Sequence, residues 1–156
     1  MVEAALKFHG YDVEEIEYAL NKNYVIDFHE ATISPEFVFK ITYNKDNPLQ
    51  YNIILGVRIG YEESGMNLPF RAEVIIRGYY EMKQESEDIE EIDVFFVRNG
   101  CAILFPYVRA LLTDITSKGR HNRVTLPTMN FYKLIEDADP KDYFLTSAEY
   151  REYRTF

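Results

Sequence analysis

Two neighbouring segments, residues 50–62 and 70–82, alternate between apolar and polar side chains, and this alternation most constrains the fold. In QYNIILGVRIGYE every second residue from Tyr51 to Tyr61 is large and apolar, and FRAEVIIRGYYEM repeats the pattern. Successive side chains of a strand point to opposite faces, so each segment predicts a half-buried β-strand. The intervening EESGMNLP contains turn-forming residues, and the two strands are therefore predicted to form a hairpin.

Two further strands are predicted upstream of this hairpin. The segment FVFKITYN, residues 37–44, alternates in the same way and leads into the turn cluster NKDNP. Residues 11–33 contain two shorter β-like pieces, of which the first also fits a helical face. We interpret this region as a long, irregular edge strand with bulges. Four consecutive strands predict an antiparallel meander with one apolar face.

An apolar run with helical spacing, CAILFPYVRALLTDITSKG, follows at residues 101–119. Its apolar residues recur at steps of three and four, as on the buried face of a helix. Proline breaks a helix in its interior but is tolerated in the first turn. Pro106 therefore predicts a helix that begins at residues 103–105 and ends near Lys118, where Gly119 follows as a stop.

The remaining segments complete the expected architecture. The acidic residues 83–94 are interpreted as a solvated loop or a short helix. A second helix is predicted from near Asn130, residues 138–142 bend or end it, and residues 143–156 form a final short helix or tail. Strands followed by helices indicate an α+β fold. We expect one domain over residues 1–156, in which a four-stranded antiparallel sheet packs against two helices.

Charge and composition exclude several classes of function. The chain has 17 basic and 26 acidic residues, a net charge of −9, which disfavours nucleic acid as a partner. It contains no apolar run long enough to span a membrane, and its N-terminus lacks the pattern of a secretory signal. The single cysteine, Cys101, rules out an internal disulfide and suits a reducing cytoplasm.

Aromatic residues are abundant: the chain has 13 Tyr and 11 Phe and no Trp. One small core needs fewer large rings than this. Two interpretations remain open, namely that some rings serve a binding surface or that the sheet has a Tyr-rich face.

The sequence contains no recognisable catalytic or metal-binding motif. His9, His29 and His121 are scattered over three segments, which gives no metal-ligand spacing, and each is expected at the surface or an edge. Cys101 has no obvious base beside it, so an inert thiol is expected. Motifs for phosphate loops, dinucleotide sites, serine hydrolases and zinc proteases are absent. We expect no enzyme, cofactor or metal; a carboxylate pair that meets only in the fold is the catalytic alternative.

Several motifs resemble the SecB family of export chaperones. ILFPYVRALLTDITSKG resembles the family's first helix, which carries a run close to NILFPYAR, and RHNRVTLPTMNFYKL resembles its crossover loop and the NF-x-x-L start of its second helix. SPEFVFKITYN and FRAEV fall at its second and fourth strands. The resemblance covers a core of about residues 13–137, and residues 143–156 form an extension in place of the family's usual polar end.

This resemblance implies an ATP-independent holdase that binds unfolded polypeptides in long apolar grooves and assembles as a homotetramer, a dimer of dimers. Non-directional apolar burial suits a client without a fixed shape. The family's groove-lining positions fall on Phe37, Phe39, Ile41, Phe131 and Leu134. The alternative for each of these residues is that it packs the sheet against a helix.

The resemblance also implies surfaces for assembly and for partners. Tetramer contacts fall on Tyr107, Thr113 and Ser117 of the first helix, although solvent exposure is the alternative for the two hydroxyl residues. An acidic position at which the family docks the motor SecA falls on Glu73, but the nearby apolar position falls on Arg71, which reverses the local charge. Some SecB-like proteins instead guard an antitoxin, and SecA and an antitoxin are the two named partners that the family offers.

A non-catalytic assembly protein that binds one folded partner through the same apolar faces remains the alternative function from a different class.

Overall fold

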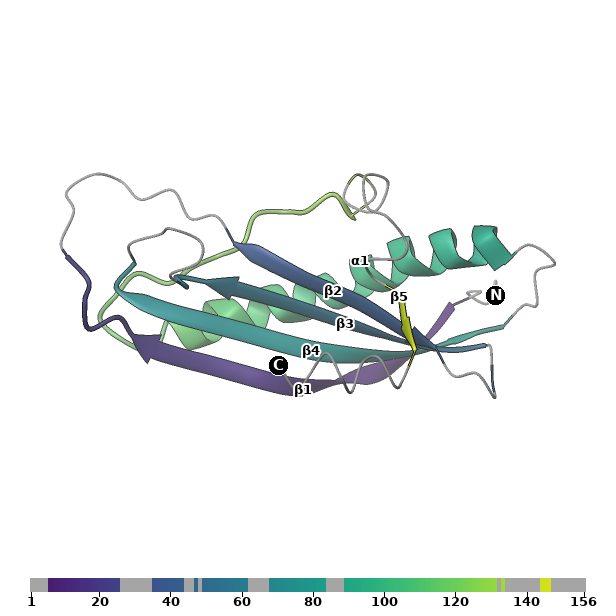
Figure 1. Ribbon diagram of the computed structural model, residues 1–156, viewed down its shortest axis with the longest axis horizontal. Helices are drawn as coiled ribbons and strands as arrows, with labels where there is room; N and C mark the ends of the chain where they lie inside the picture. The colour runs from purple at the N-terminus through teal and green to yellow at the C-terminus, as the bar shows by residue number, and fades with distance from the viewer. Residues whose placement is uncertain are drawn as a thin grey trace.

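The computed structural model describes residues 6–25, 35–43, 47, 49–61, 68–83, 89–131, 133 and 144–146, with the backbone alone at 43, 89–97 and 144–146. In this part of the chain a long helix lies across one face of a twisted sheet (Figure 1). The elements are, in chain order, β1 (Leu6–Leu20), β2 (Glu36–Tyr43), β3 (Gln50–Ile59), β4 (Phe70–Met82), α1 (Ile89–Thr116) and β5 (Phe144–Thr146). This arrangement is the α+β fold that the sequence predicted.

The four predicted antiparallel strands are confirmed, but the simple meander is wrong. The order in the sheet is β1-β4-β3-β2-β5, so β1 pairs with β4 rather than with β2. The predicted β3–β4 hairpin is present, with Leu55 opposite Ile76. Alternation tells which face of a strand is apolar, and it contains no information about which neighbour the strand pairs with. For that reason the order could not be read from the strand patterns.

The first strand is irregular, as predicted, but it spans Leu6–Leu20 rather than 11–33: residues 21–25 are not part of the strand, and 26–33 lie outside the described residues. Its pairing with β4 shifts register between Phe8 and Tyr11 and again between Val13 and Glu15. Gly10, which lies at the first shift, has a φ of +104°, a conformation that favours glycine. β1 is also an edge strand, so only one of its sides is hydrogen-bonded to the sheet.

The start of the helix corrects the prediction made from Pro106. α1 begins at Ile89, and Pro106 lies well inside it. An interior proline costs about 3 kcal/mol because it lacks the N–H that the carbonyl four residues earlier would accept. Leu104, Val108 and Leu112 of the same helix are completely buried. At about 1.5–3 kcal/mol for each such side chain, their burial outweighs that cost.

Because α1 begins at Ile89, the acidic segment 83–94 is also reinterpreted. Its last six positions, 89–94, belong to the helix, whereas residues 84–88 lie outside the described part of the chain. No helix among the described residues, including the 28-residue α1, is long and apolar enough to cross a membrane.

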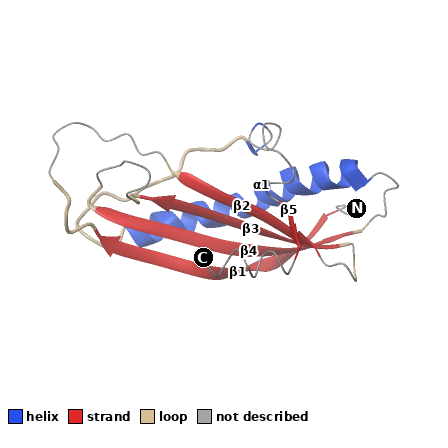
Figure 2. Ribbon diagram, viewed as in Figure 1, coloured by secondary structure: helices blue, strands red, loops and turns tan. Residues whose placement is uncertain are grey.

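The core lies between α1 and the face of the sheet that the helix covers (Figure 2). Gly100 allows the closest approach, because a Cβ at that position would overlap the side chain of Ile53 on β3. The buried Tyr80 hydroxyl of β4 donates a hydrogen bond of 2.6 Å to the Gly100 carbonyl. This bond also satisfies a hydroxyl that would be costly to bury without a partner.

The end of α1 fixes the segment that follows it. The Thr116 hydroxyl donates to the Leu112 carbonyl at 2.8 Å and accepts the backbone N–H of Val124 at 2.9 Å. Val124 and Leu126 are buried, so residues 120–130, which lead to Phe131, are held as an extended segment along the β2 side of the molecule (Figure 1).

The two remaining predictions concern the C-terminal third of the chain. Phe131 and Lys133 are helical, and Asn130 accepts the Lys133 N–H at 3.3 Å, the contact expected of a helix N-cap. Most of the predicted second helix, including Leu134, lies outside the described residues. The predicted short helix or tail at 143–156 is corrected in part, because residues 144–146 form β5 and pair in parallel with β2.

Candidate functional site

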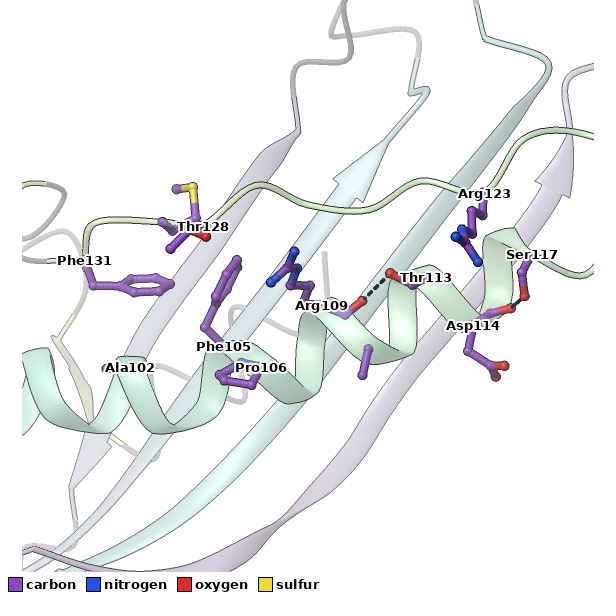
Figure 3. Close-up of a pocket in the computed structure, with 12 residues that line it drawn as sticks. Ala102, Phe105, Pro106, Arg109, Thr113, Asp114, Ser117, Arg123, Thr128 and Phe131 are labelled. Carbon is purple, nitrogen blue, oxygen red and sulfur yellow. Dashed lines mark hydrogen bonds between the residues drawn. The ribbon is translucent and has the colours of Figure 1, made fainter.

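A groove of about 750 Å³ lies between α1 and the segment 120–131 (Figure 3). Its size falls within the range of ordinary ligand sites. One side is the exposed face of the helix, and the other side is the extended segment that Thr116 and Val124 tie to the helix end. The groove is lined by Ala102, Phe105, Pro106, Arg109, Ala110, Thr113, Asp114, Ser117, Arg123, Thr128, Met129 and Phe131.

One end of the groove is aromatic. The Phe105 and Phe131 rings meet edge to face with their centroids 5.0 Å apart, a favourable geometry for aromatic pairs. On the other side of Phe105, the ring of Phe37 on β2 lies 6.4 Å away. Phe105 therefore joins two of the predicted client-binding residues, Phe37 and Phe131, into one row of rings.

The five predicted client-binding residues differ in exposure. Phe37 and Phe39 are half-buried and pack against the core, while Phe131 is 6% exposed. Ile41 is 0% exposed in the single chain, and Leu134 lies outside the described residues. The exposed apolar surface of this set thus comes from the two Phe side chains of β2.

Beyond the aromatic end the groove is charged. Arg109 and Asp114 from α1 and Arg123 from the extended segment line it, and all three side chains are exposed (Figure 3). Asp114 lies 3.5 Å from Lys118, one turn further along the helix. Within the described part of the chain, neither guanidinium has a carboxylate partner. The groove therefore offers two cationic donors beside an aromatic end.

Pro106 adds a polar acceptor to the helix side. Because proline has no N–H, the carbonyl of Ala102 loses the donor it would have in a regular helix. Ala102 and Pro106 are both exposed and both line the groove. The proline ring therefore replaces no core side chain, and the cost of the missing hydrogen bond is offset by burial on the other face of the helix.

The predicted assembly residues lie on two sides of α1. Thr113 and Ser117 line the groove, and their hydroxyls donate to carbonyls of their own helix, those of Arg109 and Asp114. Tyr107 lies on the opposite flank, where its ring is 4.6 Å from that of Tyr11 on β1. The helix thus exposes a surface that runs from β1 to the groove.

Exposed apolar side chains continue along β1. Val13 is 44%, Ile16 45% and Leu20 62% exposed, and each lies opposite a core residue of β4, on the side of the sheet that faces α1. We call these three residues the β1 flank. With the exposed Ile103 and Tyr107 of α1 they form an apolar border of the molecule.

The face of the sheet opposite α1 is charged, and it includes Glu73. Glu73 lies 3.8 Å from Arg58, and Arg71 lies 2.9 Å from Glu17. The Arg58 guanidinium also stacks over the Tyr61 ring at 3.8 Å, an arrangement typical of a cation–π contact. Acidic and basic groups therefore compensate each other around Glu73, the position at which the family docks SecA, beside the charge reversal at Arg71 that the sequence indicated.

The carboxylates of Glu15, Glu17 and Glu73 come within 4.8 Å of one another on this face. Burial, followed by repulsion from Glu15, raises the pKa of Glu73. Burial and the nearby Glu73 raise the pKa of Tyr61 to about 12. Both effects follow from removing charge from water and placing like charges together.

The cysteine and the histidines occupy unremarkable positions. Cys101 is completely buried, and burial raises the pKa of its thiol. His9 lies 3.0 Å from Glu81, the His121 ring lies 6.2 Å from that of Phe70, and His29 lies outside the described residues.

Of the lining residues, Phe131 alone was predicted to bind a client; Phe105, Arg109, Arg123 and Met129 are among those with no predicted role. A signal for the helix side was available, because Ala102, Pro106, Ala110, Thr113 and Ser117 recur at steps of three and four, as on one helix face. The partner segment gave no such signal, since an extended stretch has no period that identifies what it packs against.

Comparison with known proteins gives three findings. The SecB family, described as preprotein translocase subunit SecB, matches residues 20–141. An uncharacterised protein of Methanocaldococcus jannaschii is 33% identical over 128 residues, which cover 82% of this chain and 81% of that protein. A SecB-like chaperone of Mycobacterium tuberculosis, solved in complex with a ChAD peptide from the HigA1 antitoxin, is similar with a TM-score of 0.64 and 13% identity, over 80% of this chain and 91% of that one. The last comparison shows a shared fold.

Proposed function

The chain belongs to the SecB family, and from that premise we propose that it is a non-catalytic, ATP-independent holdase that binds unfolded polypeptides. The single observation that carries this proposal is the row of rings from Phe37 through Phe105 to Phe131, which leads from β2 into a groove of about 750 Å³. Apolar contact is non-directional, so such a surface accepts segments of many sequences.

The groove also has features that suit a polypeptide in particular. The carbonyl of Ala102, freed by Pro106, offers an acceptor for a backbone N–H, and Arg109 and Arg123 offer donors for carbonyls or carboxylates. These groups bind main-chain atoms, which every client has. We propose that Phe37, Phe39 and Phe131 contact the client, and that Ile41 supports them from the core.

We assign two classes of client to this site, preproteins for export and an antitoxin. An antitoxin is supported by the M. tuberculosis complex, in which a chaperone of this fold binds an antitoxin peptide. Docking of SecA through Glu73 has less support, because Arg58 and Arg71 compensate the acidic groups nearby. We place this activity in the cytoplasm, in accord with the single buried cysteine.

The proposed assembly is a homotetramer, a dimer of dimers. The β1 flank and the exposed side of α1 leave apolar residues uncovered in the single chain, which is typical of surfaces that pack against another protein. Tyr107, Thr113 and Ser117 are the proposed contacts along α1.

The proposed function is tested by adding the purified protein, without nucleotide, to an unfolded client and following aggregation by light scattering. We expect suppression at a stoichiometric amount of chaperone. Phe39→Ser is expected to raise the Kd for a labelled unfolded peptide by about tenfold, the effect of losing one apolar side chain. Val25→Ser, which removes an exposed apolar residue elsewhere, is the matched control. Equal aggregation with and without the protein would end the proposal.

Competition separates a holdase from an assembly protein with one folded partner. Several unrelated unfolded peptides should displace one another from a holdase. A protein that binds a single folded partner should release its ligand to none of them.

A further inference from the structure

The C-terminal strand β5 lies beside β2, the strand that carries Phe37 and Phe39, two of the proposed client contacts. β2 pairs with β3 along its whole length, and on its other side β5 pairs with it in parallel at Ile41–Tyr43. The register places Phe144 opposite Ile41 and Leu145 opposite Thr42. A segment from the far end of the chain is thus the outermost strand of the sheet, paired with the end of β2 that follows Phe37 and Phe39.

This segment resembles a client in its chemistry. Residues 143–156, YFLTSAEYREYRTF, contain five aromatic residues and follow the part of the chain that matches the SecB family, which ends at residue 141. The strand adds to a sheet edge through main-chain pairing, a mode by which extended polypeptides of many sequences are bound. β5 therefore does what an extended client segment would do.

The pairing is short. Three residues form it, and the net gain from a few backbone hydrogen bonds is of the same size as the entropy lost by ordering the residues. The tether raises the effective concentration of the segment at β2, so it stays bound without strong contacts. A free client with a longer apolar segment can displace it.

We propose that β5 is a built-in occupant of the client site, and that an extended apolar segment of the client displaces it and pairs with β2 at Ile41–Tyr43 in its place. This inference rests on the proposed holdase function. β5 then limits which clients bind, because a client must have enough affinity to displace it. The apparent affinity for a client is reduced by the fraction of molecules in which β5 occupies β2.

A reversible lock tests the proposal in the full-length chain. Thr42 and Leu145 are Cα partners, and neighbouring strands are spaced within the range that a disulfide spans. A chain with Thr42→Cys and Leu145→Cys is oxidised, checked for the bond by mass, and assayed with a labelled unfolded peptide. We expect the Kd to rise at least about tenfold on oxidation and to return after reduction. Leu145→Cys alone, treated identically, is the control, and Cys101 is completely buried.

A second variant weakens the pairing of β5 with β2 instead of locking it. Leu145→Pro removes a strand N–H in β5 and should lower the Kd by about threefold or more, whereas Ala148→Pro, outside β5, should leave it unchanged. An oxidised double-cysteine chain that binds as tightly as the reduced one, or one that forms no disulfide, overturns the inference. If the reduced chain and the unmodified protein both fail to suppress aggregation, the proposed function fails instead.

Discussion

Among single residues, two glycines with positive φ allow two causes of instability to be distinguished: an unfavourable backbone conformation, and overlap of a new side chain with its neighbours. Gly10 has a φ of +104° with open space where a Cβ would lie, whereas Gly60 has a φ of +76° and a Cβ there would overlap the Phe70 carbonyl oxygen. We expect Gly10→Ala to reduce the free energy of unfolding by about 1–2 kcal/mol and Gly60→Ala to reduce it by more than about 2 kcal/mol. Urea unfolding measures both, and equal losses would contradict the overlap.

Glu73 gives a prediction about pH. Its pKa is raised in the folded protein, so the folded state binds this proton more tightly than the unfolded chain does. Stability from this group is therefore present at low pH and is lost as the pH rises from the ordinary glutamate range through the raised pKa. Glu73→Gln should then be more stable than the native protein at pH 7, with no such gain at pH 4.

Urea midpoints at the two pH values measure this difference. Glu81→Gln, on the same face of β4 but beside His9, controls for the loss of one carboxylate. A Glu73→Gln protein that is less stable at pH 7 would mean that attraction to Arg58 outweighs burial and the repulsion from Glu15.

Among the elements, α1 is destabilised by its interior proline, which removes one of the hydrogen bonds that a helix of this length would otherwise have. Pro106→Ala restores the N–H that the Ala102 carbonyl lacks, on an exposed side of the helix where a methyl group meets no core residue. We expect the free energy of unfolding to increase by up to about 3 kcal/mol, measured by urea denaturation. The same change should weaken client binding if the free carbonyl accepts a hydrogen bond from the client. A loss of stability in Pro106→Ala would contradict this account.

The helices and strands differ in how well their bounds and pairing could be predicted from the sequence. Alternation, with Ile54 as an exception, was enough for β3, β4 and their hairpin, and an irregular pattern in the N-terminal region was enough for the bulged β1. The pairing of β1 with β4 was not predictable, because an apolar face can pack equally well in several strand orders. The start of α1 was missed because Pro106 was given a local role, while the core packing that overrides it depends on the whole fold.

The residues of the site also differ in whether the sequence could predict them. From the resemblance to the family, Phe131 was named for client binding and Thr113 and Ser117 for assembly, and all three line the groove. Phe105, which joins Phe37 to Phe131, belonged to the predicted helix start and had no predicted contact with β2. Arg123 comes from an extended segment without any period, so its place in the same groove as Arg109 depends on the hydrogen bond between Thr116 and Val124.

At the scale of the whole molecule, the exposed side of α1 gives a prediction about assembly. Thr113→Arg places a long charged side chain where the proposed helix contact requires a small one, while the Thr113 hydroxyl bonds only within its own helix. We expect the native protein to have four times the chain mass by light scattering, and the variant to have half of that or less. Lys133→Arg, at an exposed position off α1, should leave the mass unchanged. A native protein that is monomeric would contradict the proposed tetramer.

The pairing of β1 with β4 has a consequence for how the chain is made. β2, β3 and β4 are neighbours in both sequence and sheet, so each can pair as soon as it leaves the ribosome. β1 emerges first and must wait until Phe70–Met82 has been synthesised before it finds a partner. During that interval Leu6 and Tyr18 of β1, which pack into the core of the finished chain, are exposed in a nascent chain with nothing to cover them. A protein proposed to shield other polypeptides thus passes through a vulnerable stage of the same kind during its own translation.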